Sequence, residues 1–463
     1  MIVSPAFADA PWCDGPNNAV LYQGRRLDYR TLKARVQDRV FVLGALGLLP
    51  GQVVMVPDAP ALELLLMQHS LARFGAILFP FRADLARMEV EELARLTGAE
   101  WRWLPESGHL RGISDVPQSA ARCGDARISL LIKTSGSTGT PKVVMLTADN
   151  LLASAQATNA RLGLGAGDLW LACLRQSHIG GVSIGYRCAL AGAAVRLYDG
   201  FDAQAVGRGL CDSPVTHVSL VPPMLARLLE LGVSPPPRLR VLLVGGQALS
   251  ETLARRAVER GWPLHLTYGM TETASQIATT TTLTGQGMDT ALAGRLLEGV
   301  EVDARPCETG ASMRLKVKGR TLMAGYANPA RRPGLGLQRG CFETPDIACV
   351  SADGQLRILG RADDVLVVGG INVSLRRVEQ LLTGVPGVRD CVVLGLDDDV
   401  WGHRLAAVFS GEIDASGLEQ WCRRHLQSAE RPRVFRRLRE LPLLDSGKHD
   451  RQRIRAELVL SGP

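Results

Sequence analysis

The sequence predicts an α/β protein with a large N-terminal domain of mostly parallel sheets flanked by helices and a small, mobile α+β C-terminal domain. Short apolar runs typical of buried strands alternate with amphipathic runs typical of helices between residues 27 and 360. A charged segment at residues 360–364 interrupts this alternation, and a new set of elements follows it. With 463 residues, 46% of them hydrophobic, the chain is long enough for at least two buried cores.

The N-terminal alternation begins with an expected strand at residues 53–57, a helix at 61–74 and a strand at 76–81. Its second part contains four expected strands and two expected helices. The strands are residues 170–174, 194–197, 215–221 and 239–244, and the helices are residues 222–231 and 251–260. Apolar strands separated by helices favour parallel pairing.

The C-terminal unit of about one hundred residues suits a small α+β domain. A hairpin arm is expected at residues 354–359, just before the boundary. Beyond it we expect a helix at 375–382, strands at 389–396 and 404–410, and a helix at 416–427. The chain thus resembles a large domain that carries a small lid.

The net charge of +7 and the pI of about 9.0 would attract polyanions, but basic and acidic residues are interleaved along most of the chain. Nucleotide substrates suit this balance as well as nucleic acid does. The densest basic stretch, residues 423–439, has one aromatic residue, Phe435. A solvated face and an anion-facing surface are equally good interpretations of it, and nucleic acid is not expected as a partner.

Ten cysteines are scattered without a C-x-x-C pair, so we expect neither a zinc site nor a disulfide framework, and reduced thiols throughout. Residues 1–15 lack both the basic start and the long apolar run of a secretion signal. Apolar runs elsewhere, such as residues 40–50, are too short to span a bilayer. We therefore expect a cytoplasmic protein with no membrane partner.

The most specific local signal is a hydroxyl- and glycine-rich loop that follows the apolar run at residues 128–132. Its members are Thr134, Ser135, Gly136, Ser137, Thr138, Gly139, Thr140, Pro141 and Lys142. Backbone N–H groups and hydroxyls in such a loop can hold phosphate oxygens. The loop is not a Walker A motif, because Pro141 stands where that motif has glycine. A polar surface turn is the weaker alternative.

These residues resemble the signature of the adenylate-forming superfamily, which includes acyl- and aryl-CoA synthetases. Other segments follow in the order of that family. Gly245, Gly246 and Gln247 are similar to its adenine-binding turn. The run Tyr268-Gly269-Met270-Thr271-Glu272 matches its Y-G-x-T-E motif. The resemblance implies that Tyr268 stacks on adenine, that Thr271 contacts the AMP phosphate and that Glu272 binds Mg²⁺.

Two further segments complete the resemblance to the nucleotide-binding residues of the family. The run Phe342-Glu343-Thr344-Pro345-Asp346 is similar to F-x-T-G-D, whose aspartate accepts hydrogen bonds from the ribose, although Pro345 replaces glycine. Residues 360–373 resemble the hinge motif, which implies that Arg361 contacts ribose or phosphate and that Asp363 is the pivot. Gly369 and Gly370 would then help to line the pantetheine tunnel. The expected division is residues 1–360 for ATP and the acid, 361–363 for the hinge and 364–463 for the lid.

Residues 441–451 resemble the P-x-x-x-x-G-K-x-x-R ending of the family, which places Lys448 as the lysine that bridges the carboxylate and the α-phosphate. The resemblance therefore implies an ATP-dependent acid:thiol ligase that uses Mg²⁺, forms an acyl-adenylate and passes the acyl group to coenzyme A. Lys142 would hold the β- and γ-phosphates. The lid would rotate between the two steps.

The acid is expected to lie near His178, Arg187 and Ser275. The run His178-Ile179-Gly180-Gly181 is similar to the gate of the family, although Ser177 replaces an aromatic residue. A T-E-T-x-S-Q run and a basic residue nine positions after the gate histidine are similar to the o-succinylbenzoate–CoA ligases of menaquinone biosynthesis. Arg187 would pair with the second carboxylate of a diacid.

Several alternatives stay open at this point. The chief one is an aryl-carboxylate ligase that transfers to CoA or to an acyl carrier protein. A luciferase-like oxygenase and a non-catalytic nucleotide-binding relative are weaker, the latter because Lys142, Glu272, Asp346 and Lys448 are all present. A homodimer is also open. Arg187 as an ordinary surface arginine is the alternative to its role in substrate binding.

Overall fold

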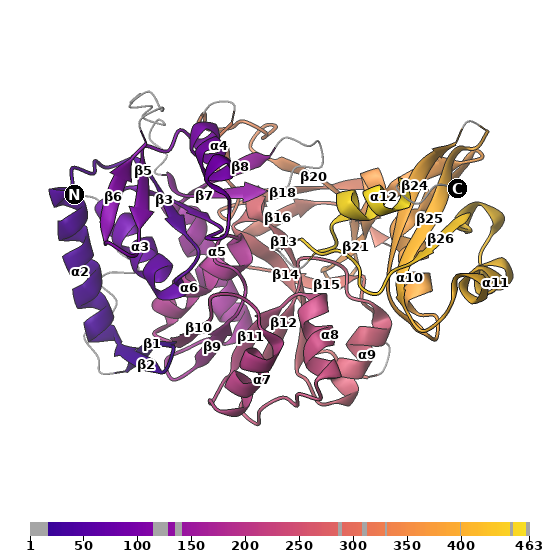
Figure 1. Ribbon diagram of the computed structural model, residues 1–463, viewed down its shortest axis with the longest axis horizontal. Coiled ribbons are helices and arrows are strands. Elements are labelled where there is room, and N and C mark those ends of the chain that lie inside the picture. Colours follow the sequence, from indigo (N-terminus) through magenta and orange to yellow (C-terminus); the bar gives the residue numbers. More distant parts are fainter. Residues whose placement is uncertain are drawn as a thin grey trace.

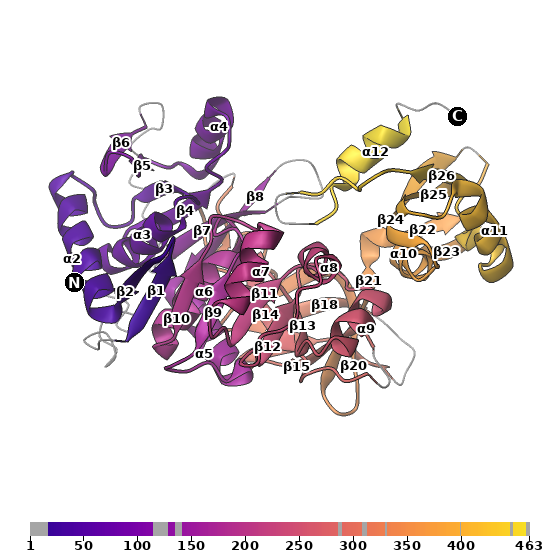
Figure 2. The same cartoon turned by 60° about the horizontal axis from the view of Figure 1, so that its bottom comes forward.

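The computed structural model describes residues 17–113, 128–134, 141–285, 289–307, 313–328, 331–398, 400–444 and 448–459, with the backbone alone at 363, 367, 372 and 459. Figures 1 and 2 both place the C-terminal elements β24, β25, β26 and α11 together at one end of the molecule, beyond β21. The α2 helix lies at the opposite end. The predicted large domain and smaller C-terminal domain are confirmed.

A 14-stranded sheet forms one layer of the large domain, in the order β16-β18-β20-β21-β15-β14-β13-β12-β11-β9-β10-β1-β2, with β17 on β20. Its parallel part comprises β1 (Asn18–Tyr22), β9 (Leu169–Ala172), β10 (Ala194–Leu197), β11 (His217–Leu220), β12 (Val241–Val244) and β13 (Leu264–Met270). The other strands are β2 (Arg25–Asp28), β14 (Ser275–Thr279), β15 (Leu292–Leu296), β16 (Val300–Asp303), β17 (Arg305–Pro306), β18 (Met313–Gly319), β20 (Phe342–Val350) and β21 (Gln355–Arg361). These pair antiparallel except for β17, so the sheet is mixed.

A 7-stranded sheet forms the second layer, in the order β19-β8-β7-β4-β3-β5-β6. Its strands are β3 (Val53–Pro57), β4 (Ile77–Phe81), β5 (Trp101–Leu104), β6 (His109–Gly112), β7 (Ile128–Thr134), β8 (Lys142–Thr147) and β19 (Gly325–Tyr326). The β3, β4 and β7 strands pair parallel. Both β3 and β4 are buried along their whole length, as expected for strands covered on both faces.

Helices fill the space between these sheets and cover their outer faces. The α3 (Ala61–Phe74) and α6 (Ile179–Ala191) helices contribute to the cores of both sheets, because Leu64 and Val182 pack in one cluster while Leu65 and Ile184 pack in the other. The α5 helix (Ala148–Leu162) packs with them. The remaining helices of this domain are α2 (Tyr29–Ala45), α4 (Arg87–Thr97), α7 (Ala203–Cys211), α8 (Pro222–Glu230) and α9 (Glu251–Glu259).

The C-terminal domain has its own core around Val378, Val393, Phe409 and Leu418. It contains a 3-stranded sheet of β24 (Val388–Asp398), β25 (Gly402–Gly411) and β26 (Val434–Arg437), and a hairpin of β22 (Val365–Val368) and β23 (Ile371–Ser374). Its helices are α10 (Leu375–Thr383), α11 (Ala415–His425) and α12 (Arg451–Val459). Among the helices of the described chain, none combines the length and the apolar character needed to span a bilayer.

Local side chains explain several boundaries of these elements. Asp28, Thr147, Ser250, Ser374 and Asp414 each accept a hydrogen bond from a backbone N–H of the first turn, and each stands immediately before a helix. Gly75 and Gly163 end α3 and α5 in the left-handed conformation. The predicted helices and strands therefore agree with the structure to within a few residues.

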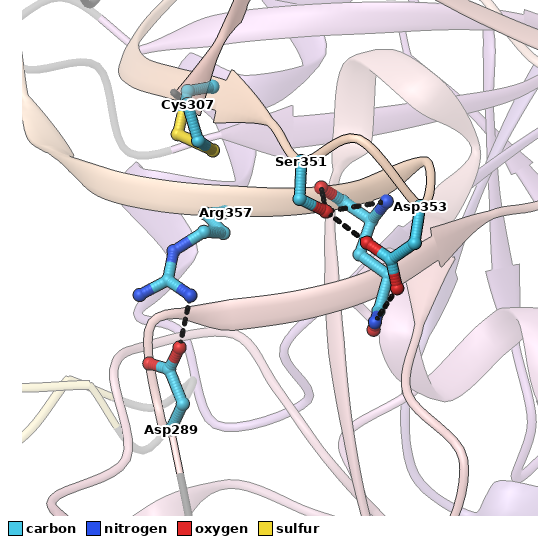
Figure 3. The surroundings of a disulfide bond; sticks show 7 residues. Asp289, Cys307, Ser351, Asp353 and Arg357 are labelled. Carbon is cyan, nitrogen blue, oxygen red and sulfur yellow. Dashed lines mark hydrogen bonds and ion pairs between the residues drawn. A yellow bond between two sulfur atoms is a disulfide. The ribbon is translucent and has the colours of Figure 1, made fainter. Parts of the chain in front are cut away.

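One expectation about the cysteines is wrong. Cys307 and Cys349 form a disulfide across 42 residues of sequence, whereas we expected only reduced thiols. Cys307 follows β17, and β17 pairs with β20 beside Cys349, so the sheet brings the two sulfur atoms together. Figure 3 shows this bond near the Arg357–Asp289 ion pair of 2.5 Å. The long separation left no local pattern for sequence reasoning to detect.

We predict that Cys307→Ser lowers the free energy of unfolding by roughly 2–4 kcal/mol, because the disulfide closes a long loop in the unfolded chain. Denaturant unfolding of the oxidised wild type and the variant measures this difference. Cys211→Ser, at an exposed free cysteine, is the matched control. Failure to recover a Cys307–Cys349 cross-linked peptide from unreduced protein would contradict the assignment.

Candidate active site

The nucleotide-side residues lie where parallel strands of the large sheet end. Gly245 and Gly246 follow β12, and Tyr268 and Gly269 lie at the end of the neighbouring β13. Carboxyl ends of adjacent parallel strands meet at one edge of a sheet, where open α/β proteins bind ligands. A Cβ atom on Gly245 would lie 2.6 Å from Thr267, and one on Gly269 would lie 2.1 Å from the Ser275 carbonyl oxygen. Glycine is therefore required at both turns. Gln247 follows directly and is half-buried.

Asp346 and Tyr268 form one hydrogen bond at this edge. The Tyr268 hydroxyl donates to Asp346 Oδ2 at 2.6 Å, and Arg361 on β21 is the direct cross-strand partner of Asp346 on β20. Burial raises the pKa of Tyr268 well above its usual value, and the charge and hydrogen bond of Asp346 act in the same direction. The structure thus brings together Tyr268, Asp346 and Arg361.

Pro345 does not break β20. The pairing of β20 with β18 is irregular between Glu343 and Ile347, and Pro345 lies inside this interval. Proline is tolerated at such irregularities because it supplies no N–H to the ladder. The Asp346 backbone N–H donates to Thr344 Oγ1 at 3.1 Å, which fixes the local course of the chain. The departure from F-x-T-G-D therefore leaves Asp346 within the sheet.

Glu272, Lys142 and Tyr326 form a second group. Tyr326 donates its hydroxyl to Glu272 Oε1 at 2.9 Å, and Lys142 Nζ lies 5.0 Å from the centre of the Tyr326 ring. The contact arises because β19, which contains Tyr326, pairs with β8, which begins at Lys142. Sequence reasoning missed Tyr326, since this pairing joins residues far apart in the chain.

The phosphate loop is only partly described. Thr134 ends β7 and is the cross-strand partner of Lys142, and its hydroxyl donates to the Lys142 carbonyl oxygen at 3.3 Å. Ser135, Gly136, Ser137, Thr138, Gly139 and Thr140 lie outside the described residues. Lys142 is exposed beside Tyr326. The two ends of the loop therefore lie next to the Glu272 group.

Glu272 suits Mg²⁺ in chemical terms. It lies in the 3-10 turn Thr271–Thr273 directly after β13, and Tyr326 engages only one of its carboxylate oxygens. Within the described residues, no cluster of three or more His, Cys, Asp or Glu side chains is placed to hold a metal. Mg²⁺ at a nucleotide is commonly held by one or two carboxylates together with substrate phosphates, and a single glutamate fits that pattern. Thr271 precedes it, half-buried.

Lys448, from the C-terminal domain, reaches the same edge. A Cβ atom on Gly246 would lie 3.7 Å from Lys448 Cε. Lys448 is exposed, but the protein around its ammonium group removes part of its hydration, which lowers its pKa. The charge of Arg361 lowers the pKa further. Asp346 and Glu272 raise the pKa. Lys448 is therefore within electrostatic range of Arg361, Asp346 and Glu272, the residues predicted to surround ATP.

His178 is the residue before α6 and is fixed by a polar network. The preceding Ser177 donates its hydroxyl to the buried Asp58 at 2.7 Å, and Arg175 lies 3.6 Å from the same carboxylate. Burial lowers the pKa of His178 to about 4, and the charge of Lys448 adds to this effect. The imidazole is therefore neutral near neutral pH. Its Nε2 atom is buried with no hydrogen-bonding partner among the described residues.

Arg187 and Ser275 meet inside the large domain. Arg187 is only 2% exposed, and its Nη2 donates to Ser275 Oγ at 2.9 Å. The guanidinium carbon lies 5.6 Å from the centre of the Trp170 ring. Burial lowers the pKa of Arg187 to about 10. No carboxylate of the described chain forms an ion pair with it, and its Nε has no hydrogen-bonding partner there.

The backbone holds Ser275 in an unusual conformation. Ala274 has a φ of +53° and Ser275 a φ of +106°, although neither is glycine. Residues that persist at positive φ indicate that the surroundings enforce the conformation, and such residues concentrate at ligand sites. Ser154 supports this turn, because its hydroxyl donates to the Ala274 carbonyl oxygen at 2.7 Å. The turn directs Ser275 toward Arg187.

Gly369 and Gly370 form the turn between β22 and β23, with φ values of +57° and +82°. Gly369 N–H donates to the Trp401 carbonyl oxygen at 2.9 Å, and a Cβ atom on Gly369 would lie 2.5 Å from the Trp401 ring. Among the described residues, this turn contacts the C-terminal domain and not the group around Lys448. Asp363 lies in the turn Ala362–Asp364 between β21 and β22.

The site combines a candidate phosphate loop, a carboxylate suited to Mg²⁺ and a lysine supplied by a second domain, as an enzyme that adenylates its substrate requires. The sequence model of the AMP-binding enzyme family matches residues 101–328, and that of the AMP-binding enzyme C-terminal domain matches residues 377–448. The chain belongs to the AMP-binding enzyme family.

Within this family, the chain is similar to proteins named 2-succinylbenzoate–CoA ligase. It is 30% identical to the protein of that name from Bacillus cereus (strain ATCC 10987 / NRS 248) over 459 residues, covering 94% of this chain and 95% of the relative. It is 32% identical to that from Staphylococcus epidermidis over 338 residues, covering 72% of this chain and 71% of the relative.

Solved structures agree with this similarity. The o-succinylbenzoate coenzyme A synthetase of Bacillus subtilis in complex with ATP and magnesium superposes with a TM-score of 0.82 at 25% identity, covering 95% of this chain and 97% of that chain. Its complex with the acyl-adenylate intermediate gives 0.81 at 25% identity, covering 95% and 96%. ATP-bound MatB from Rhodopseudomonas palustris shares the fold, with a TM-score of 0.83 at 21% identity over 98% and 99% of the two chains.

We predict that Tyr326→Phe weakens divalent metal binding in the presence of ATP by about tenfold, because it removes a hydrogen bond to a charged carboxylate. Mn²⁺ binding followed by electron paramagnetic resonance measures this without turnover. Tyr198→Phe is the control, since Tyr198 donates its hydroxyl to a backbone oxygen elsewhere in the large domain. An unchanged Mn²⁺ affinity in Tyr326→Phe would show that Glu272 does not depend on this contact.

Proposed function

We propose that this chain is an o-succinylbenzoate–CoA ligase, which adenylates the acid with ATP and transfers the acyl group to the thiol of coenzyme A. The observation that carries the proposal is the buried Arg187 beside Ser275 with no carboxylate partner in the described chain. The similarity to ligases of that name supports it.

A buried guanidinium without an anion is unfavourable, since desolvating a charge costs several kcal/mol unless a partner compensates. Ser275 supplies one neutral hydroxyl and Trp170 a ring face, and neither supplies the negative charge of an anion. A dicarboxylate resolves this conflict, because one carboxylate can pair with Arg187 while the other is activated. A monocarboxylic acid would leave the guanidinium unpaired. The geometry therefore favours a diacid over a simple aromatic acid.

In the first step, an oxygen of the acid attacks the α-phosphorus of ATP, and pyrophosphate leaves. We assign Thr271, Asp346, Arg361 and the turn at 245–247 to nucleotide binding, with Tyr268 against the adenine. Residues 134–139 and Lys142 hold the outer phosphates. Mg²⁺, when bound at Glu272, neutralises phosphate charge. Lys448 stabilises the charge that develops between the carboxylate and the α-phosphate.

Neutral His178 adds no positive charge near the attacking carboxylate. Its burial and its low pKa support a role as a wall of the acid site that can donate or accept one hydrogen bond. The network through Ser177 and Asp58 fixes the start of α6, the helix that carries Arg187. His178, at the start of α6, and Arg187, within it, are thus held by one rigid helix.

In the second step, the CoA thiol attacks the acyl carbon and AMP leaves. We propose residues 361–363 as the hinge, with Asp363 as pivot, between an N-terminal domain of residues 1–360 and a lid of residues 364–463. Rotation would withdraw Lys448 and bring the Gly369–Gly370 turn to the acyl group. The contacts of that turn within the C-terminal domain support this, because they would move with it.

The acceptor thiol has one alternative. Arg424, Arg436, Arg437 and Arg439 are exposed on the C-terminal domain and could face an acidic acyl carrier protein as well as the phosphates of CoA. We favour CoA because the similar ligases are named for it. We propose that a single chain supplies all of these residues. We propose a cytoplasmic location, where ATP and CoA are available; the Cys307–Cys349 disulfide would then have to persist against the reducing conditions of that compartment.

We predict that Arg187→Met lowers kcat/KM for o-succinylbenzoate by about 100-fold, because removing one partner of a buried charge pair costs 2–5 kcal/mol. Turnover of benzoate should not fall. Pyrophosphate release across a panel of mono- and dicarboxylic acids measures both. The control is Arg161→Met, since Arg161 is a second arginine of the large domain that bonds to backbone oxygens. Equal use of benzoate and the diacid by the wild type would contradict the proposal.

We predict that Lys448→Ala lowers adenylation at least 100-fold while thioester formation from preformed acyl-adenylate stays within a few-fold, because Lys448 meets the nucleotide residues only in the present arrangement. The two half-reactions are measured separately, by pyrophosphate exchange and by acyl-CoA formation. Lys316→Ala, at a half-buried lysine paired with Glu343, is the control. Equal losses in both half-reactions would remove the assigned role of Lys448.

A further inference from the structure

The segment that presents Lys448 is a short hairpin. Leu444 N–H donates to the Lys448 carbonyl oxygen at 2.6 Å, and Leu443 forms a β-bridge with His449. Asp450 N–H donates to the Pro442 carbonyl oxygen at 2.9 Å. Leu441 before the hairpin and Ile454 after it pack in one apolar cluster with β24 and β25, and polar contacts of the returning arm fix the residues between them.

Two ionic contacts hold that arm to the C-terminal domain. His449 Nε2 lies 2.8 Å from Asp390 Oδ2 on β24. Arg451 Nη2 donates to Glu379 Oε2 on α10 at 2.7 Å, and its Nη1 donates to the Val393 carbonyl oxygen at 2.9 Å. The His449 side chain is only 14% exposed. The residue adjacent to Lys448 is therefore the first anchor of the arm.

We propose that the His449–Asp390 ion pair positions Lys448 for adenylation and makes this half-reaction sensitive to pH. The inference rests on the proposed role of Lys448. Successive side chains of an extended segment point to opposite sides. With His449 fixed against β24, Lys448 must point away from that strand, toward the residues around Gly246. His449 is a positioning residue, because it acts through its neighbour.

The charges around His449 give the sign of the pH effect. Asp390, Glu379 and Arg451 face it from β24, α10 and α12. Burial acts to lower the pKa of His449, but the hydrogen bond and charge of Asp390, together with Glu379, raise it above the ordinary value of 6.5. The His449–Asp390 ion pair is complete at pH values below 6.5, the ordinary pKa of histidine. It is lost as the pH rises through the raised pKa of His449. The contacts of Arg451 with Glu379 and the Val393 carbonyl oxygen do not involve His449, so the arm stays attached while the anchor beside Lys448 weakens.

The test compares both half-reactions in His449→Gln and Asp390→Asn from mildly acidic to mildly alkaline pH. We expect adenylation to fall about tenfold in each variant, the scale of losing one charge-assisted hydrogen bond. Thioester formation from preformed acyl-adenylate should be unchanged. The alkaline decline of wild-type adenylation attributable to His449 should disappear in His449→Gln. His425→Gln, at an exposed histidine of α11, is the control.

NMR titration of His449 in the intact protein provides a readout without turnover, and its pKa should fall in Asp390→Asn. Equal losses in both half-reactions would indicate a merely structural contact and overturn the proposal, as would unchanged adenylation in both variants. Lys448→Ala distinguishes failure of the His449 proposal from failure of the role assigned to Lys448. If it loses adenylation selectively while His449→Gln has no effect, only this proposal fails. If it loses both steps equally, the assigned role of Lys448 fails first.

Discussion

The burial of one positive charge dominates the chemistry of the large domain. Arg187 lies on α6, between the two sheets, where the apolar faces of both leave it 2% exposed. Ser275 accepts one hydrogen bond from Arg187, and the Trp170 ring packs against the guanidinium. No carboxylate of the described chain neutralises its charge. The buried Arg187 guanidinium is unfavourable in the free protein and becomes favourable when a carboxylate of the ligand pairs with it. Its charge therefore selects a ligand with a second carboxylate. The positive φ values at Ala274 and Ser275 serve the same site.

The second organising feature is the division of the site between two domains. The nucleotide residues belong to sheet edges of the large domain, whereas Lys448 arrives from the small one on a hairpin. A lysine anchored through His449 and Arg451 to its own domain moves with that domain as a unit. One rigid rotation can therefore remove it from the nucleotide. Under the proposed rotation, two chemically different steps would share one site, because each step would use its own domain arrangement.

Sequence patterns predicted the elements well wherever the signal was local. The helix at 61–74 and the strands at 53–57 and 194–197 agree with the structure residue for residue, because the apolar pattern that predicts each element lies within the segment itself. The family resemblance named Arg187 and Ser275 as substrate residues without predicting a contact between them, and the structure places them 2.9 Å apart. Tyr326, the Cys307–Cys349 disulfide and the His449–Asp390 pair were not predicted. Each joins segments that only tertiary pairing brings together, so no local pattern encodes it.

Recognition of the second carboxylate of a diacid by Arg187 underlies the proposed choice of substrate. Its most direct measurement is the calorimetric affinity of the wild-type protein for two stable acyl-adenylate analogues, one with an o-succinylbenzoyl group and one with a benzoyl group. Both share the nucleotide, so their difference isolates the second carboxylate. The diacid analogue should bind at least tenfold more tightly, or about 1.4 kcal/mol. Equal affinities would contradict the account, because the buried guanidinium would then play no part in recognising the acid.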